Sequence, residues 1–336
     1  MAENISTINK TGEDYNTLTL WEAAKQGDLV AAGNIETAEC YDDDGDLSES
    51  VAIAGSTTNS SNYLKITVAS GDRHDGTASG GGFLLDATGT NSHGIRVENN
   101  YTRIHWVRIK GFGDGSFGAF SGIHLGLATG ARVSHCICHD ENSGNSGQAF
   151  NIGNDNDPTD IIIWNCIGYG CNRAFRQRSD DTSALNNYLY NCTGYGGTET
   201  YDIDFGSHWT AINCIAFGAS TGNDFGSIAW ESGSDYNLSE DDSAPGANSI
   251  HTVTDGANVD FVSTTGGSED FHLDVDSDAI DAGTSSVSGT VTDDIDGDTR
   301  TGSYDIGADE TTGGGGPTTS VGQMTTNTGY WGGVEV

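Results

Sequence analysis

Short apolar runs recur along the middle of the chain, separated by polar and glycine-rich stretches. Most runs span four to eight residues, contain Ile, Val, Tyr, Phe and Thr, and end at Gly, Asn, Asp or Ser. This pattern predicts short β-strands joined by tight turns. The 49 glycines, set against only 3 prolines, suit many bends between strands rather than a proline-rich disordered linker.

The strongest internal repeat has a cysteine at its centre. Its four copies read SHCICHD, WNCIGYG, YNCTGYG and INCIAFG and cover 134–140, 164–170, 190–196 and 212–218. The stretch HWVRIKGF at 105–112 fits as an earlier copy, and each copy follows a second short apolar run. Repeats of roughly 20–50 residues are typical of solenoids, propellers and helical arrays.

The spacing of the copies selects one of these folds. Cys136, Cys166, Cys192 and Cys214 lie 30, 26 and 22 residues apart. A unit of this length is too small for a four-stranded propeller blade, and it lacks the helices of ankyrin-type arrays. We therefore predict an all-β fold, a right-handed parallel β-helix, whose successive coils lie about 4.8 Å apart.

Stacked coils place equivalent side chains in columns. The four cysteines of the repeat are expected to form a column of small side chains inside the coil. Asn165, Asn191 and Asn213 each precede one of these cysteines, and His135 takes the same place in the first copy. We expect the asparagines at a bend, because Asn tolerates the left-handed backbone conformation.

The seven cysteines do not suggest a disulfide framework. Their number is odd, and no CxxC pair is present. The tight Cys136-x-Cys138 pair does not have the spacing of a zinc ribbon. Buried free thiols are the expected state.

The chain divides into three parts. Residues 1–30 are predicted to form an N-terminal cap with a short helix at 18–28, the one stretch with convincing helical spacing. Residues 31–310 are predicted to form the β-helix, ending in irregular final rungs. Residues 311–336 are a Gly-rich linker and tail with Tyr330 and Trp331, which either fray or dock on a neighbouring subunit.

The charge is strongly negative. The chain has 49 acidic and 13 basic residues, a formal net charge of −36, and residues 180–336 hold 27 of the acids and a single base, Arg300. Such a surface repels nucleic acid and anionic lipid. It attracts divalent cations or suits high salt, so the Asp-rich composition resembles that of proteins from halophilic organisms.

No segment reaches the roughly 18 apolar residues of a membrane span. The N-terminal stretch MAENISTINKTGEDYN is polar throughout, so we expect no signal peptide. Virion proteins released by lysis share this property. Removal of a signal from the natural chain is the alternative explanation.

A set of motifs near the C-terminus indicates a known module. They are Asp270-Phe271-His272-Leu273, Ala279-Ile280-Asp281-Ala282-Gly283, Asp294-Ile295-Asp296-Gly297 with Arg300, and Tyr304-Asp305-Ile306-Gly307-Ala308 with Glu310. In order and spacing they resemble the choice-of-anchor-type module that ends many right-handed parallel β-helix proteins of the pectin-lyase-like superfamily. The family usually has Pro-Gly-Ser before the second motif, where this chain has Asp276-Ser277-Asp278.

The N-terminal stretch carries a second resemblance. Gly12-Glu13-Asp14-Tyr15, followed by Leu18 and Trp21, is similar to the cap of β-helices common in tailed-phage proteins. Members of the superfamily include adhesins, virion spikes and polysaccharide-cleaving enzymes. The resemblance therefore implies the fold and leaves the activity open.

Carboxylates one rung apart are the candidate catalytic residues. Asp180 and Asp181 precede Asp202 and Asp204 by about one coil, so the two pairs could stack at the separation that glycoside hydrolysis needs. Glu231 on the following coil is a further candidate. Among 49 acids, some pair will always fall one rung apart, so solvated loop residues are the alternative.

Basic and aromatic side chains near the repeats are the candidate glycan-binding residues. Arg176 and Arg178 could clamp a sugar or carboxylate, and a lyase would have to take its base from these or from Arg173. Trp164, Tyr169 and Tyr195 could stack on sugar rings. Because every second residue of a strand points inward, these aromatic rings could equally be core.

Two dense acidic loops are the candidate metal sites, with calcium as the expected ion. They contain Asp42, Asp44 and Asp46 in the first loop and Asp294, Asp296 and Asp298 in the second. Neither loop has the EF-hand spacing of Gly and Glu. Plain turns in which Asp bonds its own backbone are the alternative.

These features favour a virion structural and adhesive protein of a tailed virus, a spike, fibre or capsid-surface projection that contacts host-surface glycans. A polysaccharide-degrading enzyme, either glycoside hydrolase or lyase, and a secreted cell-surface adhesin are the alternatives.

We expect a homo-oligomer, preferably a trimer, with a pentamer as second choice. The expected partners are host polysaccharide and, through the tail, other virion proteins. The expected location is the virion, or else the cell surface or medium.

Overall fold

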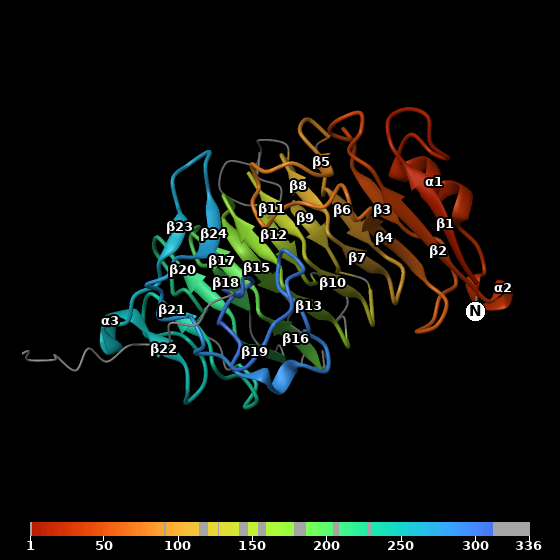
Figure 1. Ribbon diagram of the computed structural model, residues 1–336. Coiled ribbons are helices and arrows are strands. Elements are labelled where there is room, and N and C mark those ends of the chain that lie inside the picture. The colour runs from red at the N-terminus through yellow and green to blue at the C-terminus, as the bar shows by residue number, and fades with distance from the viewer. Residues whose placement is uncertain are drawn as a thin grey trace, which may run out of the picture.

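The computed structural model describes residues 2–90, 92–113, 120–126, 128–140, 147–153, 159–177, 186–203, 208–226 and 230–311. Within these residues the chain forms the predicted right-handed parallel β-helix. Figure 1 shows one elongated stack, with α1 and β1 at one end and β22 and α3 at the other.

Three parallel sheets form the sides of the β-helix. Sheet 1 contains, in spatial order, β1 (Ala2–Ile8), β2 (Asn34–Cys40), β4 (Leu64–Val68), β7 (Arg103–His105), β10 (Arg132–Ser134), β13 (Ile162–Trp164), β16 (Asn187–Tyr190) and β19 (Trp209–Ile212). Sheet 2 contains β5 (Leu84–Asp86), β8 (Arg108–Lys110), β11 (Ile137–His139), β14 (Ile167–Tyr169), β17 (Thr193–Tyr195), β20 (Ile215–Phe217), β21 (Leu238–Ser239) and β22 (Ile250–His251). Sheet 3 contains β3 (Val51–Ile53), β6 (Ile95–Val97), β9 (Ser121–His124), β12 (Gln148–Asn151), β15 (Arg173–Gln177) and β18 (Tyr201–Ile203).

The N-terminal end of the stack is covered by α1 (Leu18–Lys25). The Thr17 side chain caps this helix by accepting the Leu20 N–H at 3.1 Å. Leu18 and Trp21 are fully buried against the first rungs. The apolar end of the coil is thereby shielded from water, as a solenoid requires.

Two details of this end differ from the predicted cap. The helix ends at Lys25 rather than at 28, because Gln26 leaves the helical conformation and Asp28 caps a separate helix, α2 (Leu29–Ala32). The segment before α1 forms β1, which pairs with β2 along its whole length. The cap region therefore also adds a strand to sheet 1.

The predicted columns are present. His135, Asn165, Asn191 and Asn213 all have left-handed backbones, with φ of 51°, 48°, 47° and 57°, at the corner between sheets 1 and 2. The four cysteines that follow them lie one residue before the paired strands of sheet 2 and are fully buried as free thiols. Residues that repeat along the sequence therefore lie above one another on successive rungs.

A second column, of aromatic rings, lies inside sheet 3. Phe150, Phe175, Tyr201 and Phe225 stack on successive rungs, with ring centroids 4.8, 4.7 and 4.8 Å apart. Each of these rings is at most 1 % exposed. These rings fill the part of the core beside the small cysteine side chains of the repeat.

The predicted irregular final rungs are present only as far as β22, because β21 and β22 still pair in parallel with sheet 2. After β22, α3 (Thr252–Asp255) leads into β23 (Phe261–Ser263) and β24 (Asp270–Leu273), which pair antiparallel with each other and with none of the three sheets in the described structure. The chain, including a short 3₁₀ helix at Ser285–Val287, then doubles back along the flank of the stack (Figure 1). We call residues 256–311 the returning module.

The returning module covers an apolar surface on the outer face of sheet 2. Its outward positions include Ile137, Ile167 and Tyr169, which would form an apolar surface in water. Phe271, Ile295 and Ala308 of the returning module cover them. A second cluster packs Val287, Val291 and Tyr304 of the module against Trp164, Tyr190 and Ile212 of sheet 1.

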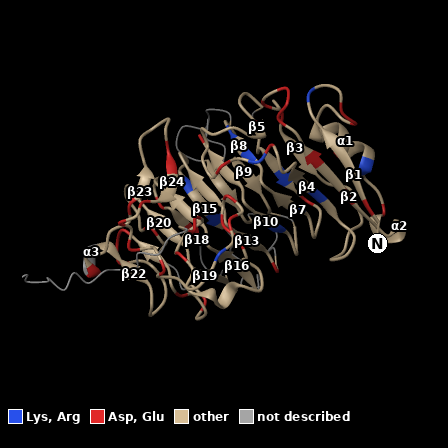
Figure 2. Ribbon diagram, viewed as in Figure 1, with Lys and Arg blue, Asp and Glu red and all other residues tan. Residues whose placement is uncertain are grey.

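Charge is distributed unevenly along the stack. Figure 2 shows Lys and Arg mainly on the strands of the N-terminal half, while Asp and Glu gather on the loops of the C-terminal half. The returning module carries 14 acids and one base, Arg300, whose guanidinium is buried and paired with Glu310 at 3.0 Å. In the described part of the chain, no helix is long and apolar enough to cross a membrane.

Candidate functional site: a groove at Glu231

Two neighbouring cavities open at the C-terminal end of sheet 1. The larger has a volume of about 520 Å³ and is lined by Asn223, Phe225, Gly226, Trp230, Glu231, Ser232, Ser234, Ser243, Pro245 and Gly246. The smaller, of about 230 Å³, is lined by Asn186, Tyr188, His208, Thr210, Glu231 and Gly233. Glu231 lines both cavities, and we call the two together the Glu231 groove.

Local pairing fixes the walls of the groove. The Glu231 N–H donates to the Trp209 carbonyl at 3.0 Å, and the Asp235 N–H donates to the Ala211 carbonyl at 3.1 Å. Residues 231–235 therefore run alongside β19 as an additional, irregular rung. Tyr188 on β16 and Thr210 on β19 line the smaller cavity from the two preceding rungs.

Trp230 gives the groove an aromatic wall with a free donor. Its ring packs edge-on against Phe225 at 5.5 Å and Tyr201 at 6.3 Å, which anchors it to the core column. Its indole Nε1–H is buried and has no hydrogen-bond partner among the described residues.

Glu231 and His208 form a hydrogen-bonded pair that lines the smaller cavity. The His208 Nδ1 contacts Glu231 Oε1, and the two side chains are 37 % and 40 % exposed. Both side chains can therefore be reached from solvent. They offer a hydrogen-bond acceptor and a donor beside the aromatic ring of Tyr188.

The groove has the composition of a carbohydrate-binding surface. Aromatic faces bury the apolar side of a sugar ring, and hydroxyl, amide and carboxylate groups bond its hydroxyls. Acid–base hydrolysis of a glycosidic bond needs a second carboxyl group close to the first. Glu231 is the single carboxylate among the described residues that line the two cavities.

Of the four predicted catalytic acids, Asp202 lies within the described residues. Asp202 lies on β18 in register with Arg176 and is 8 % exposed. Its carboxylate contacts the Nε of Arg173 and lies 3.4 Å from the Nε of Arg176. Asp180, Asp181, Asp204 and Arg178 lie outside the described residues, so the paired-acid hypothesis stays a prediction.

The predicted sugar-stacking rings lie beneath the returning module. Tyr169 is 4 % exposed, with its ring stacked on His139 at 5.2 Å and against Phe271 at 5.0 Å. Tyr195 packs on the same Phe271, and Trp164 packs against the module on sheet 1. Burial raises the pKa of Tyr169, as expected of a core phenol. Tyr169 is buried and Trp164 and Tyr195 are partly buried, and all three lie on the outer side of the sheets under the module rather than inside the coil. Sugar stacking by these rings stays a prediction.

Side chains of the first acidic loop contact basic and polar neighbours. Asp46 lies 3.5 Å from Lys110, and Asp44 accepts a hydrogen bond from Thr11. Burial raises the pKa of Asp42. The loop does not gather its three carboxylates around one point within the described residues. Calcium binding there stays a prediction.

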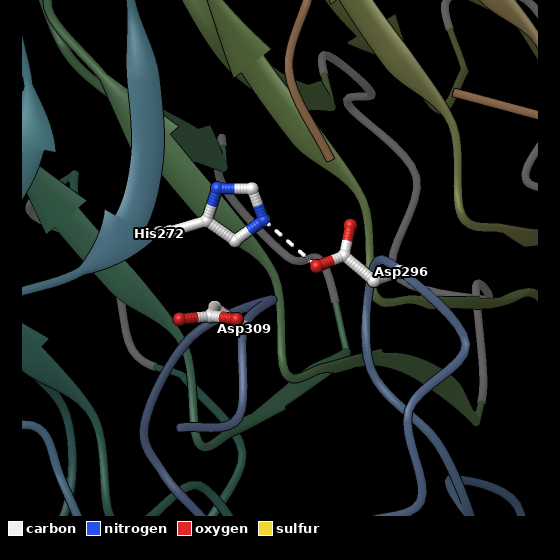
Figure 3. Close-up of side chains that lie close together, drawn as sticks. All are labelled: His272, Asp296 and Asp309. Carbon is white, nitrogen blue, oxygen red and sulfur yellow. Dashed lines mark hydrogen bonds and ion pairs between the residues drawn. The ribbon is translucent and has the colours of Figure 1, made fainter. Parts of the chain in front are cut away.

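In the second acidic loop, Asp294 acts as a turn residue. Its Oδ1 accepts the N–H groups of Asp296 at 3.0 Å and Asp298 at 2.8 Å, and its Oδ2 accepts the Glu310 N–H at 3.2 Å. Asp294 therefore forms the plain turn, bonded to nearby backbone, that is the alternative to a metal site. Asp296 itself points away from this turn, toward His272 (Figure 3).

No protein-family model matches the chain, and no curated protein matches it. Among solved structures, the chain is similar to one described as the crystal structure of pectate lyase Pel9A, with a TM-score of 0.45 and 13 % sequence identity. The match covers 92 % of this chain and 96 % of that chain.

Proposed function

We propose that this chain binds polysaccharide in the Glu231 groove, and that it does so as a surface protein of a tailed-virus particle. The observation that carries the binding proposal is the groove itself: two cavities that share Glu231, one lined by Trp230 and the other by Tyr188 and the exposed His208. A parallel β-helix also presents an elongated face along which successive sugar units can lie.

Three further points support the particle setting. The N-terminal stretch resembles the cap of tailed-phage β-helices, and its Leu18 and Trp21 close the first rungs as such a cap would. The net charge of −36 disfavours nucleic acid and anionic membranes as partners. The tail with Tyr330 and Trp331, which lies outside the described residues, is the segment that we expect to contact other virion proteins.

The binding proposal is tested with the full chain and a panel of capsular and cell-wall polysaccharides in affinity electrophoresis. We expect retardation by at least one polysaccharide. Tyr188→Ala and Glu231→Gln should each weaken binding about tenfold or more, because each removes a direct contact. Tyr41→Ala is the matched control, since Tyr41 is a partly buried tyrosine near the opposite end of the stack.

Two results would count against the groove. Binding that survives both groove substitutions would place the sugar elsewhere, and the absence of binding to every polysaccharide would remove the proposal. A reducing-end assay on the same samples separates binding from cleavage. Cleavage lost in Asp202→Asn, but retained in Glu231→Gln, would instead favour the sheet 3 acids and the enzyme alternative.

The setting and the assembly need separate measurements. Mass spectrometry of purified particles should detect the chain if it belongs to the virion, whereas a cell-surface adhesin should be found in the envelope or secreted fraction. Light scattering should give about three times the mass of one chain if the homo-oligomer is a trimer. A single 35.0 kDa species would overturn the oligomer proposal.

A further inference from the structure

Three ligand-type side chains converge on the returning module, away from the Glu231 groove. His272 lies on β24, Asp296 on the second acidic loop, and Asp309 near the end of the module. One ligand atom from each lies within 4.8 Å of the other two. In Figure 3 the His272 ring and the Asp296 carboxylate point toward each other, with Asp309 close to both.

The histidine is oriented as a metal-binding histidine is. Its Nδ1 contacts the Asp270 Oδ1 at 2.5 Å, which leaves Nε2 facing Asp296 Oδ2 at 2.9 Å. In metal sites the second ring nitrogen of a ligating histidine is commonly held by a carboxylate in this way. Asp270 would therefore be the positioning residue of His272.

The second carboxylate of the cluster is also held in place. Asp309 is 6 % exposed, and its Oδ2 accepts the N–H of Leu273, the residue next to His272, at 2.8 Å. Burial opposes its charge and raises the pKa of Asp309 to about 6. The only base of the module, Arg300, is committed to Glu310 and to the carbonyl groups of Gly307 and Ala308.

A glycine leaves space beside the ligand atoms. Gly76, in the loop that follows β4, has φ of +75°, and a Cβ at this position would come within 2.4 Å of His272 Nε2 and 2.5 Å of Asp296 Oδ1. Any side chain there would therefore fill the gap next to both atoms. The glycine keeps this side of the cluster open.

We propose that His272, Asp296 and Asp309 together bind one divalent transition-metal ion of the zinc class. An imidazole nitrogen with two carboxylates suits Zn²⁺ or a neighbouring first-row ion, whereas Ca²⁺ takes oxygen ligands. The ligand atoms around a tetrahedral zinc lie roughly 3.3 Å apart, so small side-chain movements bring all three onto one ion. The ion would balance the two carboxylates and join three segments of the module that covers sheet 2.

The test is zinc binding by the full chain after chelator dialysis. We expect calorimetry with ZnCl₂ to show a single equivalent bound per chain, and thermal unfolding to shift upward by about 5 °C when zinc is in large excess over its dissociation constant. CaCl₂ and MgCl₂ at the same concentration should not reproduce this shift. The buried cysteines are not accessible competitors in the folded chain.

Substitutions separate this cluster from other acids. His272→Ala and Asp309→Asn should abolish the shift, while Asp270→Asn should weaken zinc binding by about 10–100-fold. Asp298→Asn is the matched control, because Asp298 is an exposed acid of the same loop outside the cluster. Circular dichroism of each metal-free variant checks that it folds.

Two outcomes would overturn the proposal. One is a wild-type chain that binds no zinc, and the other is a folded His272→Ala variant that binds zinc as the wild type does. Polysaccharide retardation measured on the same variants should be unchanged, since the Glu231 groove shares no residue with this cluster.

Discussion

Asn213 exchanges two hydrogen bonds with Thr284, although 71 residues separate them. The Asn213 Oδ1 accepts the Thr284 N–H at 2.9 Å, and its Nδ2 donates to the Thr284 carbonyl at 2.8 Å. The other asparagines of the column also bond the returning module, through the carbonyl groups of Asp293 for Asn165 and of Asp305 for Asn191. One column therefore both turns the chain at each rung and holds the module on the flank.

Replacing Asn213 should loosen the module. Asn213→Ala loses both bonds to Thr284 and disfavours the left-handed backbone, so we expect the free energy of unfolding to fall by about 3 kcal/mol in urea titrations. Asn213→Gly keeps the backbone conformation and loses only the bonds, so it should cost less. If both variants unfold like the wild type, the asparagine column does not hold the module.

The aromatic column should be a major source of stability. Phe175 is fully buried between Phe150 and Tyr201. Phe175→Ala leaves a cavity, and we expect it to lower the free energy of unfolding by about 3–5 kcal/mol. Val275→Ala is the control, because this valine is 78 % exposed and its loss should change stability by less than about 0.5 kcal/mol.

The thiols should be inert in the folded protein. All seven cysteines are buried and free. Because a thiol reagent cannot reach a buried sulfur, we expect no reaction at pH 8 in native buffer and reaction of all seven in denaturant. Rapid native modification of any of the four column cysteines would contradict the stacked arrangement.

Acid should destabilise the protein partly through His93. Burial, with His124 and Arg96 nearby, lowers the pKa of His93 to about 3 from its ordinary 6.5. Between these values the unfolded chain binds a proton that the folded chain excludes. The free energy of unfolding should therefore fall as the pH drops through this window, by up to about 1.4 kcal/mol per pH unit, and should be fully recovered above it.

A substitution isolates the contribution of this histidine. The His93 Nδ1 accepts the Ser121 N–H at 3.0 Å, and His93→Asn keeps an acceptor at that place without a titrating group. Urea titrations at a series of pH values should give a shallower acid dependence for the variant than for the wild type. Equal slopes would mean that His93 is protonated equally in both states.

The rungs were predictable because they repeat. Each asparagine and cysteine of the column meets its own copy one coil away, so the spacing along the chain alone indicates which residues stack. The path of the returning module was not predictable in this way. It depends on Phe271 and Ile295 covering sheet 2, a contact between segments more than 100 residues apart that no periodic pattern records.

Contacts between distant segments also explain which site residues could not be predicted from the sequence. Asp296 was selected for its acidic loop, but its closest ligand-type neighbours, His272 and Asp309, meet it only after the module has folded back. Trp230 carries no repeat signature, and only the folded structure places its cavity and that of His208 on either side of a shared residue, Glu231. The Asp270–Leu273 motif was recognised, yet its strand was expected as a final rung of the coil.

The backward course of the module has a consequence for labelling residue 311. The Thr311 N–H donates to Asp305, whose carbonyl accepts from Asn191, so residue 311 lies on the side of the rod and not at its far end. A label attached at residue 311 would therefore report on the flank, and a label on β22 would report on the tip.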